Sequence, residues 1–138
     1  MIKAEDLRIG DLVKINENCS LKEGVISYIT EIRTRGIFEK EDYVKVKHFD
    51  SDWEFGVWCC NIDPIPLTPE ILEKNGWKRD KLVPYIYGLE AHNIEVICTP
   101  NSEWVDVTFK GDTLHRIKYV HELQHILWAL GLDANLTI

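Results

Sequence analysis

Apolar and polar residues alternate in several short runs along the first half of the chain, a pattern typical of β-strands with one exposed face. In YVKVKHF, Val44 and Val46 face one way while Lys45 and Lys47 face the other. Similar runs are LRIGDLVKI, GVISYITEI and EFGVWCCNI, with polar loops between them. Four or five short strands within about 65 residues predict a small SH3-like β-barrel, and a curled antiparallel sheet is the main competitor.

The pattern changes in PIPLTPEILEKNGW, which predicts a short helix. Thr68 suits the N-cap, Pro69 the first helical position and Gly76 the position after the C-cap. Ile71 and Leu72 would then face inward. Beyond this helix, PYIYGLE, NIEVICT and EWVDVTF predict three strands of a β-meander, because the loops between them have hairpin-like lengths.

A final helix is predicted to begin between Ile117 and Tyr119 and to end at Gly131, since glycine readily adopts the left-handed conformation that terminates helices. Its apolar stripe, flanked by Ile126, consists of Val120, Leu123, Leu127 and Leu130. The fold class is therefore α+β. We expect a β-rich SH3-like lobe over residues 1–64 and an α+β lobe over residues 65–138. The prolines between them favour two packed lobes, with a single domain as the alternative.

Composition narrows the classes of function. The 138 residues are 45% apolar and 28% charged, as in ordinary folded proteins, and the formal net charge is −7. Nucleic-acid binding is not expected, because it normally draws on Lys and Arg. No leader-like or membrane-spanning run is evident, so we expect a cytoplasmic protein without membrane association. The four cysteines match neither a CxxC pair nor a disulfide framework and are expected to be free thiols.

The segment YVHELQHILWALGLD contains the one apparent catalytic signature, HExxH, formed by His121, Glu122 and His125. Two histidines four residues apart lie on one face of a helix and can share a zinc ion, while the glutamate acts on the bound water as general base. The motif therefore supports a zinc-dependent hydrolase as one hypothesis.

Two further observations weigh against zinc. A catalytic site needs a third protein ligand, and Asp133, the only ionisable side chain after His125, would lie roughly 12 Å farther along a continuing helix at about 1.5 Å per residue. Upstream candidates are His92, Cys98 and His115. Helical phase also places His121 and His125 about 160–180° from the centre of the apolar stripe. We therefore expect a solvent-facing histidine pair, no bound metal and no catalytic residue.

An aromatic cluster in DSDWEFGVW provides a second candidate site. Trp53, Phe55 and Trp58 stand beside acidic residues, and such an edge could bind a basic or proline-rich protein partner. The alternative is that these aromatic side chains fill the core of a small barrel.

Three segments together resemble a family of small uncharacterised proteins of Bacteroides-type bacteria, many of them encoded in prophages or other mobile elements. These segments are LRIGDLV, IDPIPLTPEILEKNGW and IKYVHELQHILWALGLD, and the resemblance spans almost the whole chain. It implies no established activity. The family's ending often reads YVHQLQN, without counterparts of Glu122 and His125, which implies that HELQH is a variant of a structural helix.

The favoured hypothesis is a non-enzymatic binding or accessory protein of phage or mobile-element origin, acting on a protein partner and needing no cofactor. Its basis is the β-rich first half, the acidic balance and the lack of a complete catalytic set. The alternatives are the zinc hydrolase and, more weakly, a mimic of nucleic-acid charge.

Overall fold

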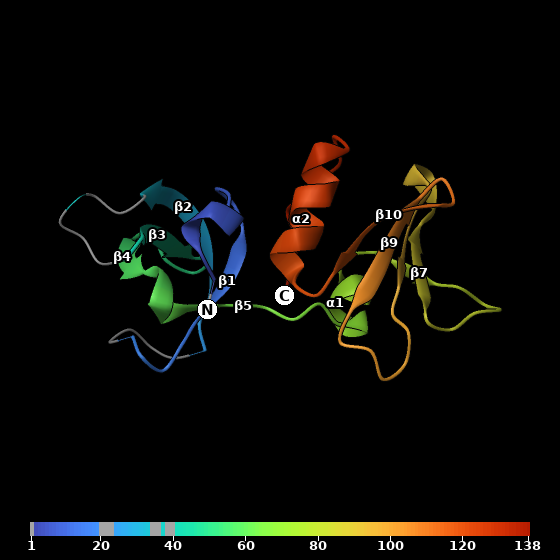
Figure 1. Ribbon diagram of the computed structural model, residues 1–138, viewed down its shortest axis with the longest axis horizontal. Coiled ribbons are helices and arrows are strands. Elements are labelled where there is room, and N and C mark those ends of the chain that lie inside the picture. Colours follow the sequence, from blue (N-terminus) through green and yellow to red (C-terminus); the bar gives the residue numbers. More distant parts are fainter. Residues whose placement is uncertain (1, 20–23, 34–36, 38–40) are drawn as a thin grey trace.

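The computed structural model describes residues 2–19, 24–33, 37 and 41–138 and shows an α+β protein with two five-stranded antiparallel sheets. Helix α2 stands between the two sheets (Figure 1). The elements in chain order are η1 Ala4–Asp6, β1 Leu12–Ile15, β2 Ile26–Arg33, β3 Tyr43–His48, β4 Glu54–Trp58, η2 Cys59–Asn61, β5 Ile62–Pro64, α1 Pro69–Lys74, β6 Lys78–Arg79, β7 Ile86–Leu89, η3 Glu90–His92, β8 Ile94–Ile97, β9 Val105–Phe109, β10 Asp112–Ile117 and α2 Val120–Ala129.

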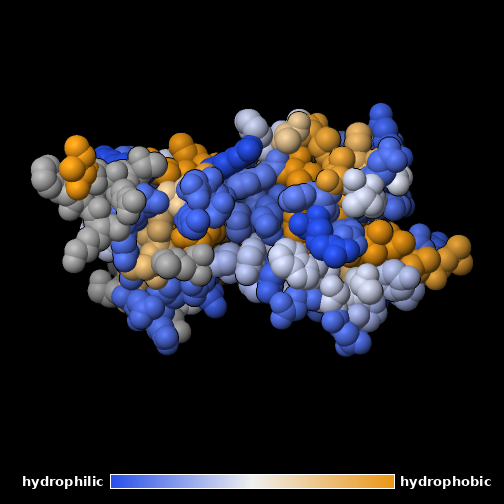
Figure 2. Space-filling view, viewed as in Figure 1, coloured by the Kyte–Doolittle hydropathy of each residue, from blue (hydrophilic) through white to orange (hydrophobic). Residues whose placement is uncertain are grey.

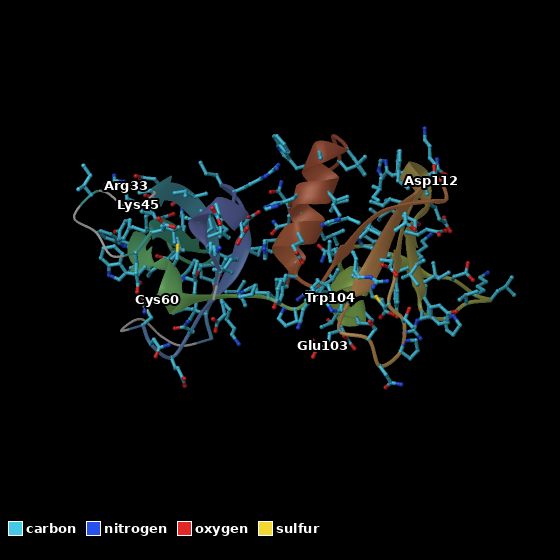
Figure 3. All side chains as sticks on the ribbon, in the orientation of Figure 1. Arg33, Lys45, Cys60, Glu103, Trp104 and Asp112 are labelled. Carbon is cyan, nitrogen blue, oxygen red and sulfur yellow. The ribbon has the colours of Figure 1, made fainter. Side chains whose placement is uncertain are left out.

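The first sheet has the strand order β4-β3-β2-β1-β5. As the alternation predicts, Val44 and Val46 are fully buried, while Lys45 stays on the outer face. There the carboxylate of Glu31 binds both Lys45 and Arg33, which lie close together in Figure 3. Among the described residues no strand pairing joins β4 to β5, so the structure shows an antiparallel sheet but no closed barrel.

The prediction of one continuous strand over EFGVWCCNI is wrong. The chain forms β4, turns through the 3-10 helix η2 and returns as β5 beside β1. Cys59 lies in this turn with its side chain in the first core, and burial raises the pKa of its thiol to about 11. All four cysteines are free thiols, as predicted.

The second sheet has the order β10-β9-β8-β7-β6, and its three central strands are those that the sequence predicts. Its buried face consists of Tyr87, Ile94, Val96, Val105, Val107 and Ile117. The sequence pattern predicts neither of the two edge strands, β6 and β10. Five of the six residues of β10 are exposed, so this strand carries no alternating signal, and β6 has only two residues.

Helix α1 forms where its capping residues predict. The Thr68 hydroxyl accepts a hydrogen bond from the Ile71 amide, Pro69 opens the helix, and Gly76 follows the C-cap with a φ of +83°. Leu72 is buried in the second core and Ile71 packs partly against it. The helix therefore covers one end of the second sheet.

Helix α2 also begins and ends close to the predicted residues, and Val120, Leu123 and Leu127 are buried in the second core. The expectation that its opposite face meets solvent is wrong. His121 and Gln124 are buried there, and His125 is half-buried. The reason is that the first sheet and the N-terminal turn cover this face, so α2 packs on both sides.

The two hydrophobic cores meet at β1. Leu12 belongs to the core beneath α2, while its neighbour Val13 belongs to the core of the first sheet. Figure 2 shows hydrophilic side chains over the junction between the two sheets on the face that it presents. Of the helices in the described part of the chain, none has the length and apolar content that a membrane crossing requires.

Candidate functional site

His125 is held by a carboxylate from the first sheet's side of the junction. Its Nε2 lies 2.7 Å from Oδ2 of Asp11, which is itself buried. The same carboxylate oxygen accepts a hydrogen bond from the Arg8 amide at 2.6 Å. The Nε2 atom of His125 is therefore engaged within the protein, and the pair ties α2 to the residues before β1.

Glu122 caps the start of α2. Its Oε2 accepts hydrogen bonds from the backbone amides of Lys118 at 2.7 Å and Tyr119 at 2.9 Å. The first amides of a helix have no partner within the helix, and a glutamate in the first turn is a common acceptor for them. This carboxylate thus has a structural role that explains its place in the sequence without any catalysis.

His121 is the most unusual residue of the motif. Its side chain is only 5% exposed, and its buried Nδ1 has no hydrogen-bond partner within the described residues. The ring stacks on Tyr119, with 5.8 Å between ring centroids, and meets the edge of His125. Burial lowers the pKa of His121, although the carboxylates of Asp11 and Glu122 act against this shift. The imidazole is therefore neutral at neutral pH.

These contacts do not fit the zinc site of a hydrolase. In such a site both histidines direct a ring nitrogen at the metal and the glutamate faces the bound water, but here Asp11 engages His125 and the helix start engages Glu122. Within residues 2–19, 24–33, 37 and 41–138, no three His, Cys, Asp or Glu side chains are grouped as a metal would need.

The upstream candidates for a third ligand lie elsewhere. Cys98 packs against the second core, and burial raises the pKa of its thiol to about 11. His92 is exposed at the end of η3. Only His115, on β10, shares a cavity with the HExxH residues.

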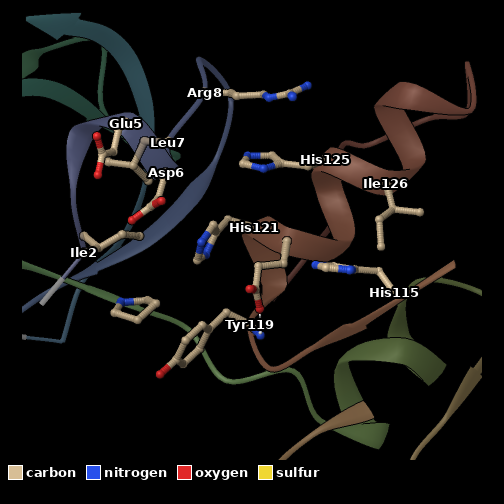
Figure 4. A pocket seen from close by; sticks show the side chains of 12 residues that line it. Ile2, Glu5, Asp6, Leu7, Arg8, His115, Tyr119, His121, His125 and Ile126 are labelled. Carbon is tan, nitrogen blue, oxygen red and sulfur yellow. Dashed lines mark hydrogen bonds between the residues drawn. The ribbon is translucent and has the colours of Figure 1, made fainter. Parts of the chain in front are cut away.

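That cavity is an open cleft of about 570 Å³ between η1 and the start of α2. Figure 4 shows η1 with Asp6 on one side, His121 and Tyr119 across from it, and His115 farther along the wall. Apolar side chains complete the lining: Ile2, Leu7, Pro64 and Ile126. Clefts of this size at the junction of two packed units are common sites for small ligands.

The cleft is acidic. Asp6, Glu5 and Glu122 line it, and the one Arg or Lys in its lining is Arg8. The Arg8 guanidinium lies over the Trp128 ring, 4.7 Å from its centroid, and in Figure 4 it points away from Asp6. The carboxylates therefore set the local potential.

The aromatic candidates do not form one surface. Trp53 is strongly exposed and Trp58 is partly exposed, with its ring edge against Tyr43. Phe55 is half-buried beside His48. Because successive side chains of a strand point to opposite faces, Phe55 and Trp58 lie on opposite sides of β4. Partner binding by these three residues stays a prediction.

Two residues of the junction, Gln124 and Asp11, carry no signal in the sequence that marks them as important. Gln124 lies on α2 with its Oε1 accepting from the Leu12 amide at 2.9 Å, and its Nε2 donates to carbonyl oxygens of Gly10 and Ala134, each at 3.1 Å. Asp11 is the partner of His125. Both looked like ordinary exposed polar residues, because only the fold reveals that the polar face of α2 is covered.

No protein-family model, curated protein or solved structure shows significant similarity to the chain. Function is therefore inferred from the geometry of the cleft and its surroundings.

Proposed function

We propose that this chain is a non-enzymatic binding protein and that its ligand site is the cleft between η1 and the start of α2. The observation that carries the proposal is His121, a buried side chain in the cleft wall whose Nδ1 has no partner in the described structure. Buried polar atoms are nearly always hydrogen-bonded, so an unpartnered Nδ1 beside a cleft is available to a ligand atom once the imidazole ring turns about χ2.

Glu122 and His125, the other two residues of the motif, are hydrogen-bonded within the protein, which supports a binding function over hydrolysis. Glu122 holds the helix start and His125 holds Asp11, so neither is free to take up the role that the motif has in zinc peptidases. Both contacts instead stiffen the wall of the cleft. A site built on fixed side chains loses less conformational entropy when a ligand binds.

The first sheet is best explained as the SH3-like unit that the alternating pattern predicts. Its order β4-β3-β2-β1-β5, with the 3-10 turn η2 between β4 and β5, is the arrangement of strands in SH3-like barrels. In keeping with the family that the sequence resembles, we assign the protein an accessory role in phage or mobile-element biology.

The binding proposal is tested by two-dimensional ¹H–¹⁵N NMR of the labelled protein with a library of small cationic, neutral and anionic molecules. We expect ligands that shift the amide signals of Tyr119, Glu122 and His125. A Glu5→Trp variant places a bulky ring over the cleft from an exposed position and should weaken these shifts. Lys3→Trp, two residues away and outside the cleft lining, is the matched control.

Two results would count against the proposal. One is a library without any molecule that moves the cleft signals, and the other is equal binding by the Glu5→Trp protein and wild type. Metal analysis of protein without a histidine tag tests the hydrolase separately: stoichiometric zinc that disappears in the His121→Ala, His125→Ala variant would establish the zinc site and reject the binding role.

A further inference from the structure

We propose that the ligand of the cleft is a small organic cation, a protonated amine or a guanidinium group carried on a short apolar chain. This inference rests on the proposed binding function. It adds the chemical class of the ligand, which follows from the charge, the aromatic wall and the apolar lining of the cleft.

The charge comes from carboxylates that have no countercharge inside the cleft. The carboxylate of Asp6 has no ion pair or hydrogen bond within the described residues, and the carboxylate of Glu122 accepts only backbone amides. Glu5 is paired with Lys3, which does not line the cleft. The carboxylates of Asp6 and Glu122, like that of Asp11, lie close enough to His121 to act on its charge. A cation entering the cleft would therefore gain attraction from several sides.

The basic side chains near the cleft are not paired with Asp6 in the described structure. Arg8 lies over Trp128. Lys118 forms an ion pair with Glu103 at 2.7 Å, and its ammonium lies 5.7 Å from the centroid of the Tyr119 ring. Lys3 is paired with Glu5 at 3.3 Å. Figure 3 places Glu103 beside Trp104, below the second sheet. None of these cations neutralises Asp6, so the position for an external positive group is open.

The wall opposite Asp6 suits a cation as well. The His121 ring, stacked on Tyr119, lines the cleft, and organic cations bind to aromatic faces; the Lys118 ammonium over the Tyr119 ring is an example within this protein. His121 is neutral, so it does not repel a positive group. An ammonium carries three N–H donors, and rotation of the imidazole ring about χ2 would bring its unpartnered Nδ1 toward one of them.

The apolar part of the lining indicates that the remainder of the ligand is an apolar chain. Ile2, Leu7, Pro64 and Ile126 line the cleft together with the charged groups. A volume of about 570 Å³ accommodates a molecule of amino-acid size or somewhat larger. An alkyl chain against these side chains with its amine near Asp6 satisfies both halves of the lining.

The test compares three probes of equal length, pentylamine, pentanamide and pentanoate, by NMR titration of the full chain at low salt. We expect pentylamine to shift the cleft signals with a Kd at least about tenfold below those of the other two. Asp6→Asn should raise the Kd of pentylamine by about threefold or more and leave the Kd of pentanamide unchanged. Asp112→Asn, an equal change of charge at the end of β10 that lies away from the cleft, is the matched control and should have little effect (Figure 3).

The outcomes separate this inference from the function beneath it. The cationic ligand is rejected, but the binding site is kept, if pentanamide or pentanoate binds the cleft as tightly as pentylamine does. The same conclusion follows if Asp6→Asn and Asp112→Asn change the affinity for pentylamine equally. If no molecule of the library binds in the cleft, both the binding function and the cationic ligand are rejected. A blocked Ala-Lys-Ala peptide distinguishes the sources: tighter binding than pentylamine indicates a lysine side chain of a protein, and weaker binding indicates a free amine.

Discussion

At the scale of single residues, Glu122 shows how a catalytic motif can arise from helix capping. Replacing it by alanine removes the acceptor for the amides of Lys118 and Tyr119. We expect the free energy of unfolding to fall by about 1 kcal/mol, as for the loss of other helix caps. Glu122→Gln keeps an acceptor oxygen, so its free energy of unfolding should fall by less than half of the loss in the alanine variant. Urea denaturation at neutral pH measures both, and equal losses in the two variants would contradict the capping role.

His121 makes the stability of the fold depend on pH. Burial lowers its pKa in the folded protein below the ordinary value of 6.5, against the opposing effects of Asp11, Glu122 and Asp6 and with a small additional lowering from His125. The unfolded chain therefore binds a proton first as the pH falls. It follows that stability decreases as the pH drops through about 6.5 and continues to decrease until His121 titrates in the folded protein.

The corresponding measurement is the free energy of unfolding from about pH 7.5 to about pH 5. His121→Phe keeps an aromatic ring against Tyr119 and should make this dependence shallower. His92→Gln, which replaces an exposed histidine, should show the same dependence of the free energy of unfolding on pH as the wild-type protein. A His121→Phe protein with the wild-type slope would show that other groups cause the pH dependence.

At the scale of elements, α2 shows what a sequence pattern predicts and what it omits. The spacing of Val120, Leu123 and Leu127 correctly identified the helix and the side that enters a core. The same reasoning assigned the polar side to solvent, because periodicity ranks faces by hydropathy only. The polar face of α2 is buried because Gln124 and His125 on it form hydrogen bonds with residues of the first sheet's side. Such a face has no apolar pattern that would reveal its burial. The cleft could not be predicted for a second reason: one of its walls comes from η1, more than 100 residues before α2 in the chain.

Edge elements were missed on the same physical grounds. The central strands β3 and β9 each bury two valines two residues apart and were predicted, whereas β10 is held mainly by backbone pairing to β9. The pattern of apolar residues therefore predicts elements that fill a core and fails for those that close its edge.

The apolar side of α2 should dominate its energetics. Leu123 is completely buried, and Leu123→Ala is expected to cost about 2–5 kcal/mol through lost burial and the remaining cavity. Trp128, on an exposed position of the same helix, contacts Arg8 at the surface, so Trp128→Ala should cost about 1 kcal/mol or less. Thermal or urea unfolding compares the two directly. A larger loss for Trp128 would mean that its surface, and not the buried stripe, holds the helix.

At the scale of the whole molecule, the question is whether the two sheets unfold together. Their junction combines an apolar contact, Leu12 in the core beneath α2, with the hydrogen bonds of Gln124 and the pair of His125 and Asp11. Loss of α2 would leave the Leu12 amide and the Gly10 carbonyl without their partner on the helix. Water would replace α2 at these groups, so each lost hydrogen bond costs about 0.5–1.5 kcal/mol, and exposure of the Leu12 side chain adds to this cost, which couples the stability of one sheet to that of the other.

We therefore expect the slowest-exchanging amides of β3 and β9 to report the same free energy of opening, within about 1 kcal/mol, in native-state hydrogen exchange. Gln124→Leu keeps the side-chain volume but removes the hydrogen bonds across the junction, and it should let the first sheet open at a lower free energy than the second. Asn135→Ala removes an amide of the same kind from an exposed position and should leave the two values equal. If β3 already opens several kcal/mol below β9 in the wild-type protein, the sheets are independent units, and the cleft between them would widen as they separate. Equal values would instead mean that the cleft keeps its shape until the whole protein unfolds, as a preorganised binding site requires.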